Sequence, residues 1–446
     1  MRDDKMVLVA FGQATVSQTQ NGAWMHPGSD PNVLQPEYYI NLGREVERAG
    51  FDLLFFDDRW AMPGTYGRSF RDAVRRGTRV VKLDLLTILG LISAHTERIG
   101  LGATYSTTYF HPFHVARAFA TLDHLSKGRA VWNIVTSLNE DEAENFGTPF
   151  MEHDSRYDRA DEFLEVVTGL WETWERDAFR LDRSTGVFAD PDKVHYLDHK
   201  GDAFVSRGPL TVPQPPQGWP VLLQAGQSGR GRKFAAQWAD LIFVVAADLA
   251  AGQKVYLEQH AAFEEVGRTA APGRILPAVH VVVGATEAIA REKKAYLDSL
   301  SDPEEALILL SELSGLDFSS YNLDEPLPAD IVSRTTGSQA IVSSIIGKLR
   351  ANYGESATTR DLGEMMGSQS SVYIVGDPRQ VADELCAWFE GRACDGFVIQ
   401  QADTPGSFED FGRYVIPELR RRGVVDEPTT QGTFRDRLGL DHRAGR

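Results

Sequence analysis

The stretch GRAVWNIVTS, residues 128–137, contains a short apolar run that is typical of a buried β-strand. Trp132 and Asn133 stand side by side inside this run, and Thr136 and Ser137 close it. A strand that only packs in a core needs neither an indole nor an amide at these positions. The polar residues therefore raise the question of what this strand faces.

Strand-like segments of the same kind lie on both sides of this stretch, and helix-like segments follow them. The predicted strands cover residues 6–12, 51–58, 99–107, 130–137, 219–226, 241–248, 275–284 and 395–403. One helix is expected to end on Gly50 and another on Gly100. Strict alternation predicts a parallel sheet, and these eight units predict an α/β fold of the closed (β/α)8 type, a TIM barrel.

A single barrel domain is expected over residues 1–423, with insertions at about 178–218 and 301–370. The first insertion is rich in Pro, Asp and Gly, whereas parts of the other have helical spacing. Long insertions usually form lids or binding loops, although an inert surface excursion is the alternative. Residues 424–446 form a C-terminal tail that we expect to pack on a neighbouring subunit or to be disordered.

The composition narrows the class of protein. A formal charge of −17 argues against nucleic acid as a partner, because phosphate neutralisation needs a basic face. No apolar window of about 18 residues is present, and the start lacks the apolar core of a signal peptide, so no membrane partner is expected. Cys386 and Cys394 are the only cysteines, which argues against a disulfide framework and fits a cytoplasmic location.

In a barrel, chemistry is expected where the strands end. The second strand ends in Asp57 and Asp58, the third near Thr104, the fourth near Asn133 and the fifth at residues 224–229. These mostly neutral groups are suited to binding a flat heteroaromatic ring. They are less suited to glycoside hydrolysis, because that reaction needs two opposed carboxylates. Adjacent side chains on a strand point to opposite faces, so at most one of the two aspartates enters the pocket.

The segment LLQAGQSGRGRKFAA, residues 222–236, runs from a strand through Gly and Ser into a helix. The free N–H groups and positive dipole end of a helix N-terminus bind phosphate readily. Ser228 is expected either to donate to a phosphate oxygen or only to cap the helix. The segment matches neither a Walker loop nor GxGxxG.

The segment MEHDSRYDRADEF, residues 151–163, opens the next predicted helix. Ser155 and Asp158 resemble a capping box, which places His153 just before the helix and Tyr157 in its first turn. Both side chains can donate to an anion, or they simply mark a solvated helix start. No metal site is expected, because the histidines of HPFH, residues 111–114, have no evident third ligand.

Five motifs together resemble the bacterial-luciferase-like flavin-dependent monooxygenases, in the nitrilotriacetate, pristinamycin and dibenzothiophene-sulfone monooxygenase branch. They are GRAVWNIVTS, LGATYSTTYFHPFHVAR, RYDRADEF, DKVHYLDHKG and VLLQAGQSGRG. The resemblance runs from about residue 5 to residue 420 and implies the same barrel. It also implies a two-component enzyme that takes reduced FMN (FMNH2) from a separate NAD(P)H:flavin reductase. Such an enzyme inserts one oxygen atom from O2 into a small organic substrate, at or next to a C–N or C–S bond.

The resemblance also assigns roles by motif position. Asp58 and Thr104 would approach the flavin ring, and Asn133 would face the barrel interior beneath it while Trp132 packs outward under a helix. A simple hydrogen bond to barrel neighbours is the alternative role for Asn133. The residues implied for the phosphate and ribityl end are His153, Tyr157, Ser228 and Gly229.

His26, on the loop after the first strand, is the candidate catalytic residue. The resemblance has two departures near the expected substrate space. Asp57 stands where the family often has Ala, and Met25 where a basic residue is common. These departures indicate an unusual substrate.

Two other functions remain open on the same barrel. One is a deazaflavin (F420)-dependent oxidoreductase, and the other is a non-catalytic flavin-binding protein. No GxGxxG follows any predicted strand, so the chain is not expected to use NADH or NADPH itself. A homodimer or homotetramer is expected.

Overall fold

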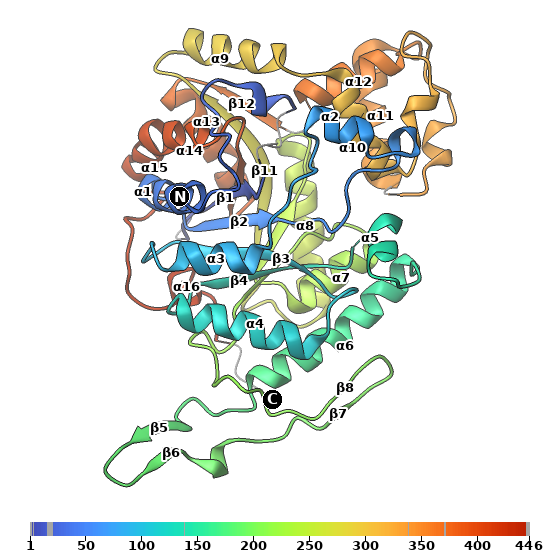
Figure 1. Cartoon of the computed structure of the whole chain (residues 1–446). Coiled ribbons are helices and arrows are strands. Elements are labelled where there is room, and N and C mark those ends of the chain that lie inside the picture. The colour runs from blue at the N-terminus through green and yellow to red at the C-terminus, as the bar shows by residue number, and fades with distance from the viewer. Residues whose placement is uncertain are drawn as a thin grey trace.

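Eight parallel strands close into a barrel in the computed structural model of the chain, which describes residues 2, 4–15, 21–137, 139–337, 339–369 and 372–442 (Figure 1). In spatial order they are β1 (Val7–Gln13), β2 (Leu53–Asp57), β3 (Gly100–Ser106), β4 (Ala130–Val135), β9 (Val221–Gln224), β10 (Leu241–Val244), β11 (Arg274–Val283) and β13 (Gly396–Gln400). The sheet closes because β10 pairs with β11 and β13 pairs with β1. The predicted (β/α)8 barrel is confirmed.

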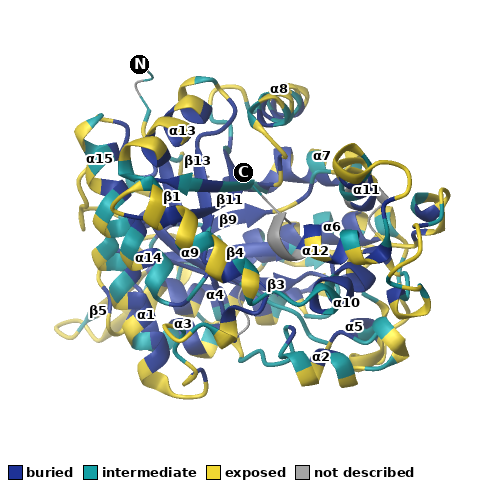
Figure 2. Ribbon diagram, turned by 90° about the horizontal axis from the view of Figure 1, so that it is seen from above, coloured by how far each residue is buried: buried dark blue, intermediate teal, exposed yellow. Residues whose placement is uncertain are grey.

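Helices cover the outside of this barrel (Figures 1 and 2). They are α1 (Pro36–Ala49), α3 (Leu85–Ser93), α4 (Pro112–Leu125), α6 (His153–Trp171), α7 (Gly229–Trp238), α8 (Leu249–Glu265), α13 (Pro378–Glu390), α14 (Gly406–Asp410) and α15 (Ile416–Arg421). Short α2 (Arg71–Arg76) and α5 (Glu140–Asn145) lie in loops that follow β2 and β4. Helix α1 ends as expected on Gly50, which takes the left-handed φ of 102° that glycine adopts without strain.

The expected end of α3 at Gly100 is wrong, because the helix ends at Ser93 and Gly100 begins β3. The buried guanidinium of Arg129 explains the early end. It donates to the carbonyl oxygens of Ser93, Thr96 and Ile99 at 3.1, 2.9 and 2.9 Å. A cation that binds these carbonyls stabilises the turn that leads into β3 in place of a further helical turn.

Side chains alternate along each barrel strand between the interior and the helices outside. Trp132 on β4 points outward and is fully buried, with ring centroids 5.5 Å from Phe119 of α4 and 6.0 Å from Phe163 of α6. Val131 belongs to the cluster inside the barrel. Asn133 shares the face of Val131 and therefore points inward. Figure 2 shows this buried centre within a ring of partly exposed helices.

The end of the described chain seals the amino-terminal end of the barrel. Phe434 of α16 (Phe434–Arg437) lies in the interior cluster, and a Cβ atom on Gly100 would come within 2.9 Å of its ring. Arg435 is fully buried and pairs with Asp240 at 2.7 Å. The expectation of a tail on a neighbouring subunit or in disorder is therefore wrong over residues 433–442, while 443–446 lie outside the described residues.

Two insertions extend from the barrel. The first carries the hairpins β5 (Phe179–Asp182)–β6 (Val187–Ala189) and β7 (His199–Lys200)–β8 (Val205–Ser206), which project from the bottom of Figure 1. The second begins before the expected residue 301, because α9 (Glu287–Ser299) already belongs to it, and it continues with α10 (Pro303–Ser314), α11 (Gln339–Tyr353) and α12 (Thr359–Gln369). A further strand, β12 (Val372–Gly376), was not expected from the sequence and pairs with the carboxyl-terminal half of β11 outside the barrel.

Two buried carboxylates attach α10 to the loops above the barrel. Glu312 accepts hydrogen bonds from the N–H groups of Gly64 and Thr65 at 3.0 and 2.8 Å and pairs with Arg59. Glu305 accepts from the N–H of Gly22 at 3.0 Å. Burial raises the pKa of Glu305 to about 7. The second insertion is therefore held against the loops that follow β1 and β2.

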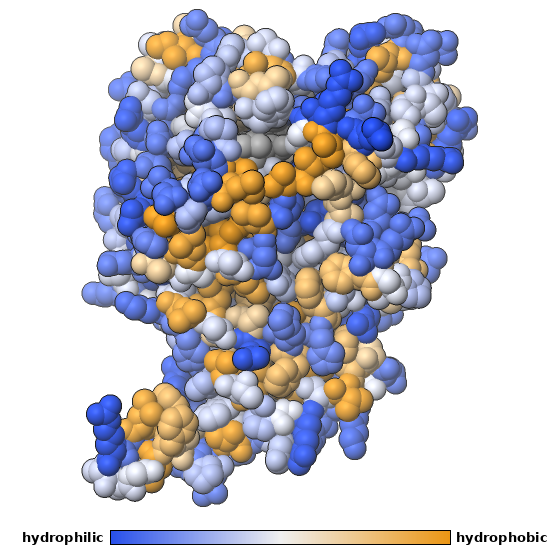
Figure 3. Space-filling model, in the orientation of Figure 1, coloured by the Kyte–Doolittle hydropathy of each residue, from blue (hydrophilic) through white to orange (hydrophobic). Residues whose placement is uncertain are grey.

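The surface of the view in Figure 1 is mostly polar, with a band of apolar side chains across its middle, over α3 (Figure 3). Leu86 and Leu91 of α3 are only half-buried. No helix in the described part of the chain has the length and apolarity needed to cross a bilayer. The homodimer or homotetramer remains a prediction, which light scattering of the purified protein would test.

Replacing Phe434 by Ala is expected to lower the free energy of unfolding by about 3–5 kcal/mol, because it opens a cavity under the barrel. Chemical denaturation measures the change. Phe188→Ala is the matched control, since this ring is 64% exposed on β6 and its loss should cost less than about 0.5 kcal/mol. Equal stability of the Phe434 variant and the natural chain would contradict the sealing role of α16.

Glu305→Gln is expected to flatten the dependence of stability on pH. The fold prefers the protonated carboxyl, so its stabilising contribution is complete below the usual pKa of 4.5 and is lost as the pH rises to about 7. In this window the free energy of unfolding of the natural chain should fall by up to about 1.4 kcal/mol per pH unit relative to that of the variant. Denaturation midpoints at several pH values measure it, and Glu292→Gln, an exposed change on α9, should follow the natural chain.

Candidate active site at the carboxyl ends of the barrel strands

Thr104 and Asn133 are neighbours in register on β3 and β4 and face the barrel interior. The hydroxyl of Thr104 donates to the carbonyl of Phe56 at 2.8 Å and accepts from Nδ2 of Asn133 at 2.8 Å. Because the single hydroxyl hydrogen is used by Phe56, the amide nitrogen of Asn133 must face Thr104. Its Oδ1 atom is buried and has no hydrogen-bond partner among the described residues. The pair therefore presents one oriented acceptor inside the barrel.

The two aspartates at the end of β2 have different environments. Asp57 is neutralised by Lys82 at 2.8 Å, with Arg79 at 3.9 Å. Asp58 accepts from the N–H of Arg59 at 2.8 Å and has no ion pair within the described part of the chain. Burial raises the pKa of Asp58 to about 7, with a further rise from the nearby charge of Asp57. Asp58 can therefore hold or release a proton near neutral pH.

A second group of predicted residues lies where the first turns of α6 and α7 meet. Ser228 caps α7 by accepting from the N–H of Gly231 at 3.1 Å, and its Oγ atom lies 3.4 Å from Nε2 of His153. Ser228 and Gly229 are exposed. The first four N–H groups of a helix have no partner within the helix. Two helix N-termini and two side chains thus direct donors to one place.

Tyr157 completes this group from the second turn of α6. Its ring centroid lies 5.1 Å from that of His153, and its side chain is 7% exposed. Burial raises the pKa of Tyr157, opposed by hydrogen bonds from Thr136 and Gln224. A Cβ atom at position 231 would lie 2.7 Å from the tyrosine hydroxyl, so Gly231 is needed for the close approach of α7.

The expected capping box of Ser155 and Asp158 is wrong. Helix α6 begins at His153 with Glu152 as its N-cap, so both residues lie inside the helix. The side chain of Asp158 instead accepts from Arg230 at 2.9 Å. This ion pair crosses from α6 to α7 and ties together the two helix starts that carry the donor group.

His26 lies apart from both groups. It ends the short helix η1 (Ala23–Met25), and its ring packs 5.5 Å from Tyr296 of α9. Nδ1 of His26 accepts from the N–H of Gly28 at 3.1 Å, so the neutral ring carries its proton on Nε2. Among the described residues, no hydrogen bond or ring contact joins His26 to the strand-end groups.

Two glutamines that were not expected from the sequence face the same interior. Gln13 is fully buried at the end of β1, and neither atom of its amide has a partner among the described residues. Oε1 of Gln400, at the end of β13, likewise has none within that part of the chain. The signal was present, because Val7, Val9, Phe11 and Gln13 share one face by the two-residue period of a strand. Buried polar atoms of this kind normally contact water or a ligand.

Comparison with known proteins identifies the family. The profile described as luciferase-like monooxygenase matches residues 13–395. The chain is 43% identical over 440 residues to the dibenzothiophene-sulfone monooxygenase of Rhodococcus erythropolis, covering 98% of this chain and 97% of the relative. It is 38% identical over 432 residues to nitrilotriacetate monooxygenase component A of Aminobacter aminovorans, covering 95% and 94%.

Solved structures agree with this assignment. The crystal structure of DmoA from Hyphomicrobium sulfonivorans matches with a TM-score of 0.90 at 34% identity, covering 98% of this chain and 93% of that one. A riboflavin lyase solved with modified FMN matches with a TM-score of 0.86 at 32% identity. An F420-dependent reductase from Methanopyrus kandleri shares the fold alone, with a TM-score of 0.57 at 16% identity. The chain therefore belongs to the luciferase-like monooxygenase family.

Proposed function

We propose that this monooxygenase binds reduced FMN at the carboxyl ends of its barrel strands and oxidises a small organic substrate. The oxidised position would be at or next to a C–N or C–S bond. The observation that carries the proposal is the meeting of the α6 and α7 N-termini at the same end of a barrel that holds an oriented, unpartnered amide oxygen. Relatives named for a sulfone and for nitrilotriacetate support this substrate class.

The donor group fits the phosphate of FMN. Ser228 and the N–H of Gly229 would bind phosphate oxygens, with His153 and Tyr157 beside them. The positive ends of two helix dipoles favour a dianion there. Both Ser228 and Gly229 are exposed, so a ligand has access to them.

The strand ends fit the flat ring of FMN. Oδ1 of Asn133 is a buried acceptor with no partner among the described residues, and an imide N–H of the ring would satisfy it. Thr104 holds that amide in the required orientation. Asp58 would lie near the ring with a pKa of about 7. When bound, reduced FMN supplies the electrons that activate dioxygen.

The protein's own part is to orient the reactants and to exclude water. Helix α10 is fixed over the β1 and β2 loops by Glu305 and Glu312, which supports a role of the second insertion as the lid. His26 offers an Nε2–H donor from the β1 loop, and a substrate bound between that loop and the ring would meet it. Asp57 and Met25 depart from the family pattern beside this space and favour an unusual substrate.

Turnover with reduced FMN and isotopically labelled dioxygen tests the function. Candidate substrates carry C–N or C–S bonds, and mass spectrometry detects the label. We expect one labelled oxygen atom in the product. Turnover with reduced F420 but not with reduced FMN would overturn the proposal, and so would tight FMN binding without any oxygenated product.

Ser228→Ala is expected to weaken binding of reduced FMN about 10- to 150-fold, because a hydrogen bond to a charged group is worth roughly 1.5–3 kcal/mol. Anaerobic titration measures the affinity. Ser228→Asp is the matched variant, since it keeps an acceptor for the Gly231 N–H but brings a negative charge to the phosphate. It should retain stability and bind FMN more weakly than Ser228→Ala. Unchanged affinity in both variants would leave Ser228 as a helix cap only.

A separate NAD(P)H:flavin reductase is expected to supply the reduced FMN. The described barrel has no GxGxxG turn after its strands, and one relative is named as component A of nitrilotriacetate monooxygenase, which favours a second component here too. The purified chain with NADH, FMN, oxygen and substrate should give almost no product. Addition of an unrelated flavin reductase, or of photoreduced FMN, should restore turnover. Rapid NADH oxidation by the chain alone, coupled to product formation, would contradict the need for a separate reductase.

A further inference from the structure

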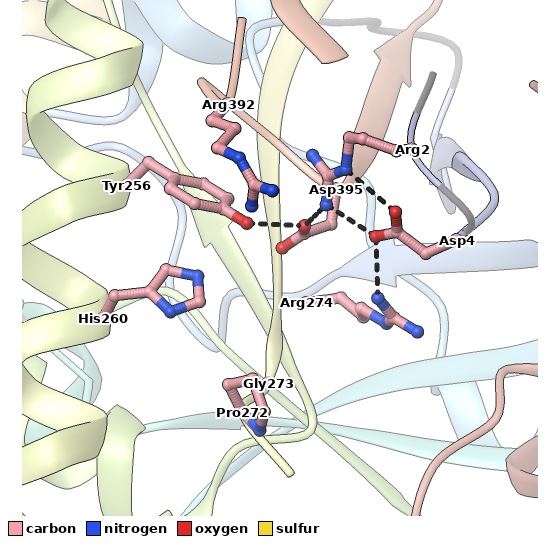
Figure 4. Close-up of a pocket in the computed structure, with 9 residues that line it drawn as sticks. All are labelled: Arg2, Asp4, Tyr256, His260, Pro272, Gly273, Arg274, Arg392 and Asp395. Atoms are coloured by element: carbon pink, nitrogen blue, oxygen red, sulfur yellow. Dashed lines mark hydrogen bonds and ion pairs between the residues drawn. The ribbon is translucent and has the colours of Figure 1, made fainter. Parts of the chain in front are cut away.

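A cavity of about 480 Å³ lies at the amino-terminal end of the barrel, opposite the candidate active site (Figure 4). It is lined by residues just before β1 and β13, by the start of β11 with the two residues before it, and by α8. The lining residues are Arg2, Asp4, Tyr256, His260, Pro272, Gly273, Arg274, Arg392 and Asp395. Nothing in the proposed flavin chemistry uses this cavity.

The two carboxylates of the cavity are already neutralised. Arg2 pairs with Asp395 at 2.5 Å and with Asp4 at 2.6 Å. Asp395 also accepts from the hydroxyl of Tyr256 at 3.1 Å and from the N–H of Ile275 at 2.9 Å. These groups form a closed network on one side of the cavity, as the dashed lines in Figure 4 mark.

Three side chains of the cavity keep nitrogen atoms without a partner among the described residues. Arg392 is exposed and has no ion pair within the described part of the chain, while Arg274 uses only Nη1 of its guanidinium in the network of Figure 4, with Asp4 at 3.2 Å. Nε2 of His260 is buried and lacks a hydrogen-bond partner among the described residues, and it donates in the tautomer that carries its proton there. Three guanidinium groups face two carboxylates, so the lining carries a local excess of positive charge in a chain of net charge −17.

The backbone of Arg392 adds an independent observation. Its φ of 54° lies in the left-handed region, where a side chain other than glycine is strained. Strained residues persist where the surroundings hold them, and they gather at binding sites. A glycine would turn the chain here without strain. Six other non-glycine residues of the described chain share this conformation, among them Ser137 after β4, so the φ angle supports the cavity only together with its lining.

We propose that this cavity binds a tetrahedral oxyanion of the phosphate type through Arg274, Arg392 and His260. The three donors come from three separate elements, and a tetrahedral anion offers an oxygen to each. A planar carboxylate offers only two. The cavity has room for a phosphate ester as well as for free phosphate.

The test is calorimetric titration of the untagged full chain at constant ionic strength. The probes are inorganic phosphate, glycerol phosphate, sulfate and acetate. We expect saturable binding of the tetrahedral anions and none of acetate. Tighter binding of glycerol phosphate than of inorganic phosphate would identify an ester as the ligand, and the reverse would identify free phosphate.

Arg392→Gly is the deciding variant. It relieves the left-handed strain, so its melting temperature should be unchanged or higher, while its affinity for phosphate should fall at least about 10-fold. A purely structural role for Arg392 would not separate the two effects. Lys254→Gln removes the same charge from the exposed face of α8 and should leave affinity unchanged.

The flavin site is the rival location for bound phosphate. Ser228→Asp should remove phosphate from that site and leave the cavity binding intact. Loss of all phosphate binding in Ser228→Asp would overturn the proposal without touching the proposed flavin function. The proposal also fails if Arg392→Gly binds phosphate like the natural chain, or if Lys254→Gln weakens binding equally.

Discussion

The alternation of side chains along β4 is the constraint on which the candidate active site depends. A shift of register by one residue would exchange Trp132 and Asn133, placing the indole in the barrel and the amide under α4. Two hydrogen bonds to the neighbouring strand β3 prevent this exchange. The indole N–H donates to the carbonyl of Tyr105 at 3.1 Å, and the amide of Asn133 donates to Thr104. The same two strands therefore hold the outer core and the inner acceptor in place.

Signals that are local in sequence predicted most of the barrel. The two-residue period of the strands and the helices between them were enough to expect the closed sheet. The donor group could also be predicted from the sequence, because Ser228 and His153 stand at helix starts and barrel topology brings neighbouring helix starts together. Even Gln13 carried a readable signal in its period, although the apolar run before it is equally typical of plain core packing.

What sequence analysis missed depends on contacts between distant residues. Ser155 and Asp158 had the spacing of a capping box, but Arg230 on the next barrel helix takes the carboxylate. Arg129 ends α3 from another element, and β12 forms only because the upper half of β11 extends beyond the barrel. The buried carboxylates Glu305 and Glu312 have no local signature, since their partners are N–H groups of the β1 and β2 loops.

The position of α16 has a consequence for the order in which the molecule is assembled. The ring that closes the amino-terminal end of the barrel belongs to Phe434. It packs against Gly100, which starts the third strand. All eight strands leave the ribosome before their seal does. During synthesis the apolar barrel interior is therefore open to water at one end, and contacts across so long a stretch of chain form slowly. The nascent chain exposes this interior at the stage when chaperones encounter it.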